Sequence, residues 1–575
     1  ETTGVDTDAE PVDPPEPCIA DAVRELLVDN CATCHSLEGS GEKAFDDPAD
    51  LADLIVRGKV VPGDPDASPL YTRVDAGAMP PMGVEPRPSD DDIALLRQWI
   101  EEGAAASCDV GPDECGDNDF LDVNWIAELI RQDLLTVEDT DALPFTRYLT
   151  LVHHHNRGLC DGEIDPYRHA LTKLVNSLST NPVVTAPLAV EGSRDLIYRL
   201  DIRDYNWEKV EVEGYDDAWE LIAANNPFAL EWNSPDFDFI NFLMTDSDVE
   251  PARPGTKFPF QPFDSFNETA IRNPDIYHAV VDIPHTLGQL EAQLDVNCDI
   301  NDDDNLNPLW AGMLKGQSNV SEFNRVIERC EFEQDNNRAY WRSFDFGRDK
   351  EIGDEDGVQG NNCKNILDEP IDFCADGGEI IFSLPNGFQA YMIVDGKGQR
   401  INEAPSNIVQ DPTVPGEVVS NPFSCIGCHN EGIKPKADTV FPLIDPNLFN
   451  FEYAQIQDLY GHSELMAQIQ IDDKGIYDAA MSQAGVPTDL EKEPIQTQIL
   501  EFEDGLDAAR VAGELQIPHD LLMEKLELIA AFVSPSYKAL RVEGGQVSRQ
   551  DFETDFDQLI CFFSYGPETF PEACL

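Results

Sequence analysis

Two short segments of the chain place cysteine and histidine at a spacing that can attach a porphyrin covalently. Both segments have the pattern C-x-x-C-H, and the residues concerned are Cys31, Cys34, His35, Cys425, Cys428 and His429. In this pattern two thiols bond to the vinyl groups of one haem while the imidazole binds its iron. A disulfide or half of a zinc site is the alternative, but zinc needs further close ligands that neither segment has nearby. The sequence therefore predicts two covalently attached haem c groups.

A third segment, residues 299–305, has oxygen-bearing side chains at alternate positions, as a calcium-binding loop has. Asp299, Asn301 and Asp303 are the candidate ligands. The segment departs from the EF-hand pattern, because Asp304 stands where glycine is expected and Trp310 where the bidentate glutamate is expected. A solvated acidic loop is the alternative to calcium binding. No nucleotide-binding, hydrolase or zinc-protease motif is present, so redox chemistry at haem is the chemistry that the sequence offers.

The charge of the chain limits its partners. Its 575 residues include 111 acidic and 38 basic side chains, for a formal net charge of −73. Binding to nucleic acid or to an anionic membrane surface is therefore electrostatically disfavoured, and a basic redox partner is expected. The alternative is that the acidic coat serves solvation in salty surroundings and selects no partner. The longest apolar runs fall far short of a membrane-spanning helix, so no transmembrane segment is expected.

The remaining cysteines indicate an oxidising compartment. Ten cysteines lie outside the two C-x-x-C-H segments, and an even number of this kind favours disulfides in an exported protein. Proximity in the sequence suggests the pairs Cys18–Cys108, Cys115–Cys160, Cys298–Cys330, Cys363–Cys374 and Cys561–Cys574. We therefore expect a periplasmic or extracellular protein whose signal peptide has been removed, with a lipid tether upstream of Glu1 left open.

The first C-x-x-C-H segment is expected in a small helical domain. Residues 1–17 are acidic and proline-rich, which predicts a flexible tether. Apolar periodicity at residues 19–27 predicts a helix leading into the segment, and a second helix is predicted at residues 93–100 behind a Ser89 cap. Residues 18–108 then form one all-α domain that contains the first haem.

The rest of the chain is expected to combine strands and helices. Residues 109–436 are predicted to form a mixed, loop-rich domain containing the second haem, and residues 437–575 a helical subdomain. Within the mixed domain, helices are expected near 125–134 and 171–178, a strand at 196–198, and a loop-rich layer at 204–275.

The clearest β pattern surrounds Asn386-Gly387, between two β-rich runs, and predicts a hairpin over 377–394. No helix is predicted before the second C-x-x-C-H segment, so the second haem is expected beside this hairpin. The fold class is thus α+β and multidomain.

Several segments resemble a bacterial family of large di-haem c-type cytochromes with an N-terminal planctomycete-type cytochrome c domain. The resemblance rests on Met79-Pro80-Pro81 in the first domain and on segments 147–156, 201–207, 377–387 and 424–429 further on. It implies a small class I cytochrome c domain followed by a region whose activity the family does not define.

The resemblance also implies the distal iron ligands. Met79 is implied as the sixth ligand of the first haem, with Met82 as its competitor and a pocket-filling role for both as the alternative. For the second haem, the best source is the run His153-His154-His155, and His153 fits the family pattern. Adjacent side chains on one element point in different directions, so at most one of the three is expected to face an iron.

Three functions are compatible with these features. We expect a di-haem c-type cytochrome that transfers electrons one at a time. A di-haem peroxidase-like oxidoreductase is the first alternative, and it would need a five-coordinate iron with an acid/base residue beside it. The second alternative is a self-assembling extracellular subunit, a homo-oligomer whose haems conduct between neighbours.

Overall fold

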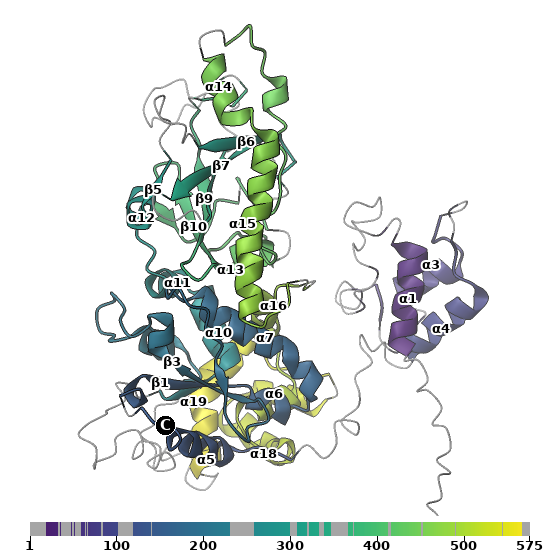
Figure 1. The fold of residues 1–575 in the computed structure, drawn as a ribbon. Helices are drawn as coiled ribbons and strands as arrows, with labels where there is room; N and C mark the ends of the chain where they lie inside the picture. The colour runs from purple at the N-terminus through teal and green to yellow at the C-terminus, as the bar shows by residue number, and fades with distance from the viewer. Residues whose placement is uncertain are drawn as a thin grey trace, which may run out of the picture. The chain divides into compact units, whose positions relative to one another are not determined.

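A computed structural model describes most of the chain. The described residues lie within 19–101, 119–229, 258–298, 308–346, 366–449 and 452–565, with shorter gaps inside these ranges. The calcium candidates Asp299, Asn301 and Asp303 lie outside the described residues, as do Cys34 and Met82. The chain divides into two compact units, residues 1–117 and 118–575 (Figure 1).

The described part of the first unit is helical. It contains α1 (Ile19–Cys31), α3 (Pro69–Asp75) and α4 (Asp90–Glu101), which confirms the helices predicted before and well after the first C-x-x-C-H segment. Val23, Leu27 and Trp99 are fully buried in a core shared by these helices. Ser89 caps the last helix as predicted, because its hydroxyl accepts a hydrogen bond from the Asp92 amide at 3.2 Å.

The second unit begins with a small sheet. Its strands are β1 (Thr146–Thr150), β2 (Leu188–Ala189), β3 (Ile197–Asp201) and β4 (Phe260–Pro262), in the order β2-β3-β1-β4. β1 pairs antiparallel with β3 and parallel with β4, so that Thr150 lies opposite Pro262. The helices around this sheet are α5 (Val123–Leu134), α6 (Val152–Asn156), α7 (Asp161–Ser177), α8 (Ala218–Asn225), α10 (Phe263–Arg272) and α11 (Pro274–Val280). The predicted strand and the two predicted helices of this region are confirmed.

A larger antiparallel sheet follows along the chain. Its order is β11-β10-β9-β8-β7-β5, and β6 also pairs with β7. The strands are β5 (Val296–Asn297), β6 (Leu309–Met313), β7 (Arg325–Phe332), β8 (Tyr340–Asp345), β9 (Gly377–Ser383), β10 (Gln389–Asp395) and β11 (Arg400–Ile401), with α12 (Leu287–Leu294) before β5. The predicted hairpin is confirmed as β9 and β10, with Ser383 opposite Gln389 and Gly387 at φ +89° in the turn.

The C-terminal part of the chain, from α14 onward, is helical, as predicted for residues 437–575. Its helices are α14 (Tyr453–Tyr460), α15 (Ser463–Gln483), α16 (Pro494–Glu503), α17 (Ala508–Glu514), α18 (His519–Phe532) and α19 (Arg549–Tyr565). The long helix α15 runs along the large sheet (Figure 1), where Asp473 accepts hydrogen bonds from Trp341 and Arg329. Helices α15 and α16 contribute to the same apolar core as the sheets, whereas α17, α18 and α19 surround a second core. Among the described helices, none has the length and apolar character needed to cross a bilayer.

The prediction of a loop-rich layer over residues 204–275 is wrong for the described part of this segment. It contains α8, β4 and all of α10. Helix α10 is buried over eight of its ten residues, and four of these eight, Asp264, Ser265, Asn267 and Thr269, are polar. Polar residues on a buried helix face hide the apolar periodicity on which the sequence prediction relied.

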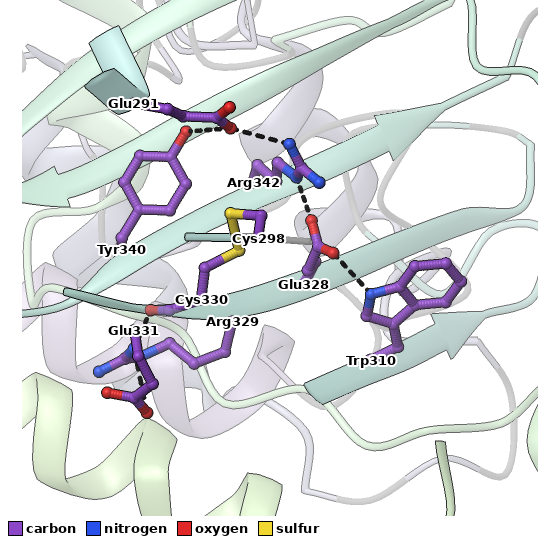
Figure 2. Close-up of a disulfide and its surroundings, with 9 residues drawn as sticks. All are labelled: Glu291, Cys298, Trp310, Glu328, Arg329, Cys330, Glu331, Tyr340 and Arg342. Carbon is purple, nitrogen blue, oxygen red and sulfur yellow. Dashed lines mark hydrogen bonds and ion pairs between the residues drawn. A yellow bond between two sulfur atoms is a disulfide. The ribbon is translucent and has the colours of Figure 1, made fainter. Parts of the chain in front are cut away.

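The predicted disulfide Cys298–Cys330 is present, and it joins the end of β5 to β7 (Figure 2). Beside it, the fully buried Glu328 accepts hydrogen bonds from Arg342 and from the Trp310 indole. Arg342 also reaches Glu291, which accepts a hydrogen bond from the Tyr340 hydroxyl at 3.0 Å. Cys160, Cys374 and Cys561 are disulfide-bonded as well.

Loss of the disulfide is expected to destabilise the second unit. Cys298 and Cys330 are 32 residues apart, and closing a loop of this length stabilises the fold by about 3–4 kcal/mol through the entropy of the unfolded chain. Urea unfolding of the double variant Cys298→Ala/Cys330→Ala, followed by circular dichroism, should show a loss of this size. A loss below about 1 kcal/mol would show that the pairing does not constrain the chain.

Candidate functional site

The second C-x-x-C-H segment lies on a short helix beside the large sheet. Helix α13 (Phe423–Cys428) contains Cys425 and Cys428 one turn apart, and His429 directly follows it. The sequence predicted no helix before this segment. In the structure the segment itself forms a short helix. The Asn421 amide before α13 donates a hydrogen bond to the Tyr391 carbonyl on β10 at 3.1 Å. The motif therefore lies against the predicted hairpin.

The His429 ring is oriented by the backbone that follows it. Its Nδ1 lies 3.1 Å from the Gly432 carbonyl oxygen, and the Gly432 amide donates to the His429 carbonyl at 2.9 Å. Gly432 has φ +84°, a left-handed conformation that favours glycine and turns its carbonyl back toward the ring. A carbonyl acceptor fixes the proton on Nδ1, which leaves the lone pair on Nε2. His429 is therefore prepared to bind a metal through Nε2.

A half-buried carboxylate faces this nitrogen. Glu379 Oε1 on β9 lies 3.9 Å from His429 Nε2, and Glu379 Oε2 accepts a hydrogen bond from Arg325 at 3.2 Å. Burial alone would raise the pKa of Glu379, but His429 and Arg325 outweigh it and lower that pKa below its ordinary value. Burial lowers the pKa of His429. At neutral pH the pair is thus a carboxylate beside a neutral imidazole.

The two thiols of this segment are neither oxidised nor gathered around one metal ion. Cys425 is buried, Cys428 is half-buried, and both are free. Burial raises the pKa of Cys425 well above its ordinary value and that of Cys428 to about 11, so both are protonated. Within the described residues, Cys425, Cys428 and His429 do not belong to any group of side chains that converge closely enough to share one ion.

The first C-x-x-C-H segment continues the end of α1. Cys31 is the last residue of that helix, and the His35 amide donates to its carbonyl at 2.9 Å. Met79 is half-buried in the loop after α3. Arg87 fixes this loop, because its guanidinium donates to the carbonyls of Gly77 at 2.9 Å and Pro80 at 2.6 Å. The backbone on both sides of Met79 is therefore held by one side chain.

The three consecutive histidines lie on α6 and are buried. His153 Nε2 lies 3.1 Å from Asp264 Oδ2, and His154 Nε2 lies 3.0 Å from Asp264 Oδ1. His155 Nε2 instead lies 3.1 Å from the Asp119 carbonyl. The expectation that adjacent histidines point in different directions is therefore wrong for His153 and His154. The Nε2 atoms of both imidazole rings converge on the Asp264 carboxylate.

The charges in this cluster are set by burial and by contact. Burial lowers the pKa of His154 to about 3. Burial alone would raise the pKa of Asp264, but the two histidines outweigh it and lower that pKa well below its ordinary value. The cluster therefore contains an ionised carboxylate and a neutral His154 near neutral pH.

Sequence reasoning missed the residues that surround the motifs. Glu379 was visible within the Gly377-Gly378-Glu379-Ile380 segment, and as a carboxylate in a strongly apolar β run it could have been singled out. Arg325 and Asp264 had no comparable pattern around them. Their importance depends on which strands and helices the fold brings together.

The chain was compared with protein-family models, curated proteins and solved structures, and it matches none of them. The functional argument therefore depends on the residues and their geometry.

Arg325 is expected to be essential for the stability of this site. Its side chain is buried between Asp345, at 2.7 Å, and Glu379. Arg325→Gln leaves both carboxylates without a cation, and breaking a buried pair in this way costs about 3–5 kcal/mol of unfolding free energy. Arg541→Gln is the control, because Arg541 pairs with Glu527 at the surface and should cost less than about 1 kcal/mol. If chemical denaturation showed equal losses of unfolding free energy in the two variants, the stabilising role of Arg325 would be contradicted.

Proposed function

We propose that the protein is an exported di-haem c-type cytochrome that transfers electrons one at a time. Cys31, Cys34, Cys425 and Cys428 attach the haems as thioethers, each thiol adding across a vinyl group without loss of any atom. His35 and His429 bind the irons, and Met79 is the distal ligand of the first. Haem iron alternates between the ferric and ferrous states, which supplies the redox chemistry.

One observation supports this proposal most strongly. Cys425 and Cys428 are free although Cys160, Cys298, Cys330, Cys374 and Cys561 are all disulfide-bonded. The thiols also do not converge with His429 on one ion. A disulfide and a zinc half-site are the two competing interpretations of C-x-x-C-H, and the geometry favours neither. In haem attachment the thiols and the imidazole have separate targets, namely two vinyl carbons and the iron.

The remaining features fit the same function. The carbonyl of Gly432 at 3.1 Å from His429 Nδ1 is the outer contact that keeps Nε2 available for iron. Disulfides favour an oxidising compartment, in agreement with export. The net charge of −73 favours a basic redox partner. The proposal assigns no distal ligand to the second haem, and it leaves His153, whose Nε2 lies 3.1 Å from Asp264 Oδ2, to the separate site described below.

Met79→Ala is expected to change one haem and leave the other intact. A thioether stabilises ferrous iron more than a nitrogen ligand or water does, so its loss should lower one of two midpoint potentials. Spectroelectrochemical titration of the wild type should give two one-electron steps, of which one shifts in the variant. Unchanged steps would contradict the assignment of Met79. In the wild type, a high-spin ferric signal from the second haem with peroxide-dependent oxidation of a donor would instead favour the peroxidase-like alternative.

Glu379→Gln is expected to raise the potential of the second haem alone. The ionised carboxylate 3.9 Å from His429 Nε2 stabilises the more positive ferric state, so its neutralisation should raise the potential on the order of 50–100 mV. Glu331→Gln is the control, because Glu331 is an exposed carboxylate on the same sheet and its field is screened. A shift of the Met79-dependent step, or equal shifts in both variants, would contradict the proposal.

A further inference from the structure

The geometry points to a second kind of metal centre in this chain: His153, His154 and Asp264 form a buried binding site for a divalent transition-metal ion such as Zn²⁺. The three side chains are 4%, 1% and 8% exposed. Their ligand atoms all lie within 4.8 Å of one another. Two imidazoles and one carboxylate suit zinc and related first-row ions.

The fold brings these residues together through one pair of strands. Strands β1 and β4 are parallel neighbours, with Thr150 opposite Pro262. Parallel neighbours end at the same edge of a sheet, so the segments that leave them start side by side. His153 and His154 follow the end of β1 within four residues, and Asp264 follows the end of β4 within two. The cluster is thus built into the topology of the small sheet.

The distances between the ligand atoms match those around a bound ion. Ligands at about 2.0–2.2 Å from one ion lie about 3.3–3.6 Å from each other at tetrahedral angles and about 2.8–3.1 Å at octahedral angles. The observed separations from the carboxylate are 3.1 Å for His153 Nε2 and 3.0 Å for His154 Nε2.

Several ring nitrogens of this cluster have no hydrogen-bond partner. Both ring nitrogens of His153 and Nδ1 of His154 are buried without a hydrogen-bond partner. His153 Nε2 is close to Asp264 but outside hydrogen-bond geometry, so the carboxylate does not satisfy it. Buried polar atoms of this kind are costly unless something binds them. An ion shared with Asp264 would satisfy Nε2.

The surroundings fix the proposed ligands. The Gln498 amide on α16 donates to Asp264 Oδ1 at 2.6 Å, and the Asn267 amide donates to the Gln498 carbonyl oxygen at 3.0 Å. The Tyr167 ring packs on His154 with centroids 3.7 Å apart. Outer contacts of this kind orient metal ligands and raise affinity. Because the ligands come from two helices, the ion would fasten α6 to α10.

The test uses the full-length protein after dialysis against a chelator, which leaves covalently attached haem in place. We expect the wild type to take up one Zn²⁺ per chain, measured by elemental analysis after gel filtration, and to gain thermal stability. His154→Gln and Asp264→Asn should each lower zinc affinity at least about 100-fold, while His169→Gln, an isolated histidine on α7, should bind like the wild type.

The outcomes are distinguishable from those for the proposed function, because haem content should be the same in all these variants. Absence of zinc uptake by the wild type, or full uptake by a folded His154→Gln variant, would overturn the inference. X-ray absorption at the zinc edge of the wild type keeps the inference testable if the variants fail to fold. It should show nitrogen and oxygen ligands, and a sulfur ligand would overturn the inference.

Discussion

The buried guanidinium of Arg325 links the large sheet to the second C-x-x-C-H segment. It lies on β7 between Asp345 on β8 and Glu379 on β9, and Glu379 faces His429 at 3.9 Å. Charges in this interior are tolerated because each has a counterion or a hydrogen bond. Three strands and the imidazole are therefore connected by one electrostatic network. A helix of only six residues, α13, is positioned by this network and by the hairpin beside it.

Elements with a clear short-range pattern could be predicted from the sequence. The Asn386-Gly387 turn, the amphipathic periodicity of α5 and the Ser89 cap each depend on neighbouring residues alone. Helix α10 could not be predicted in this way. Its buried Asp264 and Asn267 have hydrogen-bond partners on α6 and α16, far away in the sequence. In a sequence, polar residues at such positions predict a loop. They can be buried in the core only because tertiary contacts supply their hydrogen bonds.

The same distinction applies to the candidate sites. A C-x-x-C-H segment can be recognised locally because one porphyrin requires both thiols and the imidazole within five residues. Glu379 lies 50 residues before His429, and Asp264 lies 110 residues after His154. Adjacent histidines were expected to diverge, yet on α6 two of them converge on one carboxylate. Strand pairing decides which of these distant residues come into contact, and the pairing could not be predicted from composition or spacing.

The central claim is that both C-x-x-C-H segments attach haem covalently. Intact-mass spectrometry of the denatured full-length chain, produced in a host that attaches haem c, tests it most directly. The account predicts the mass of the polypeptide plus two haems, and a loss of one haem mass in the double variant Cys425→Ala/Cys428→Ala. A wild-type mass with one haem or none, or a double variant that keeps both, would contradict it.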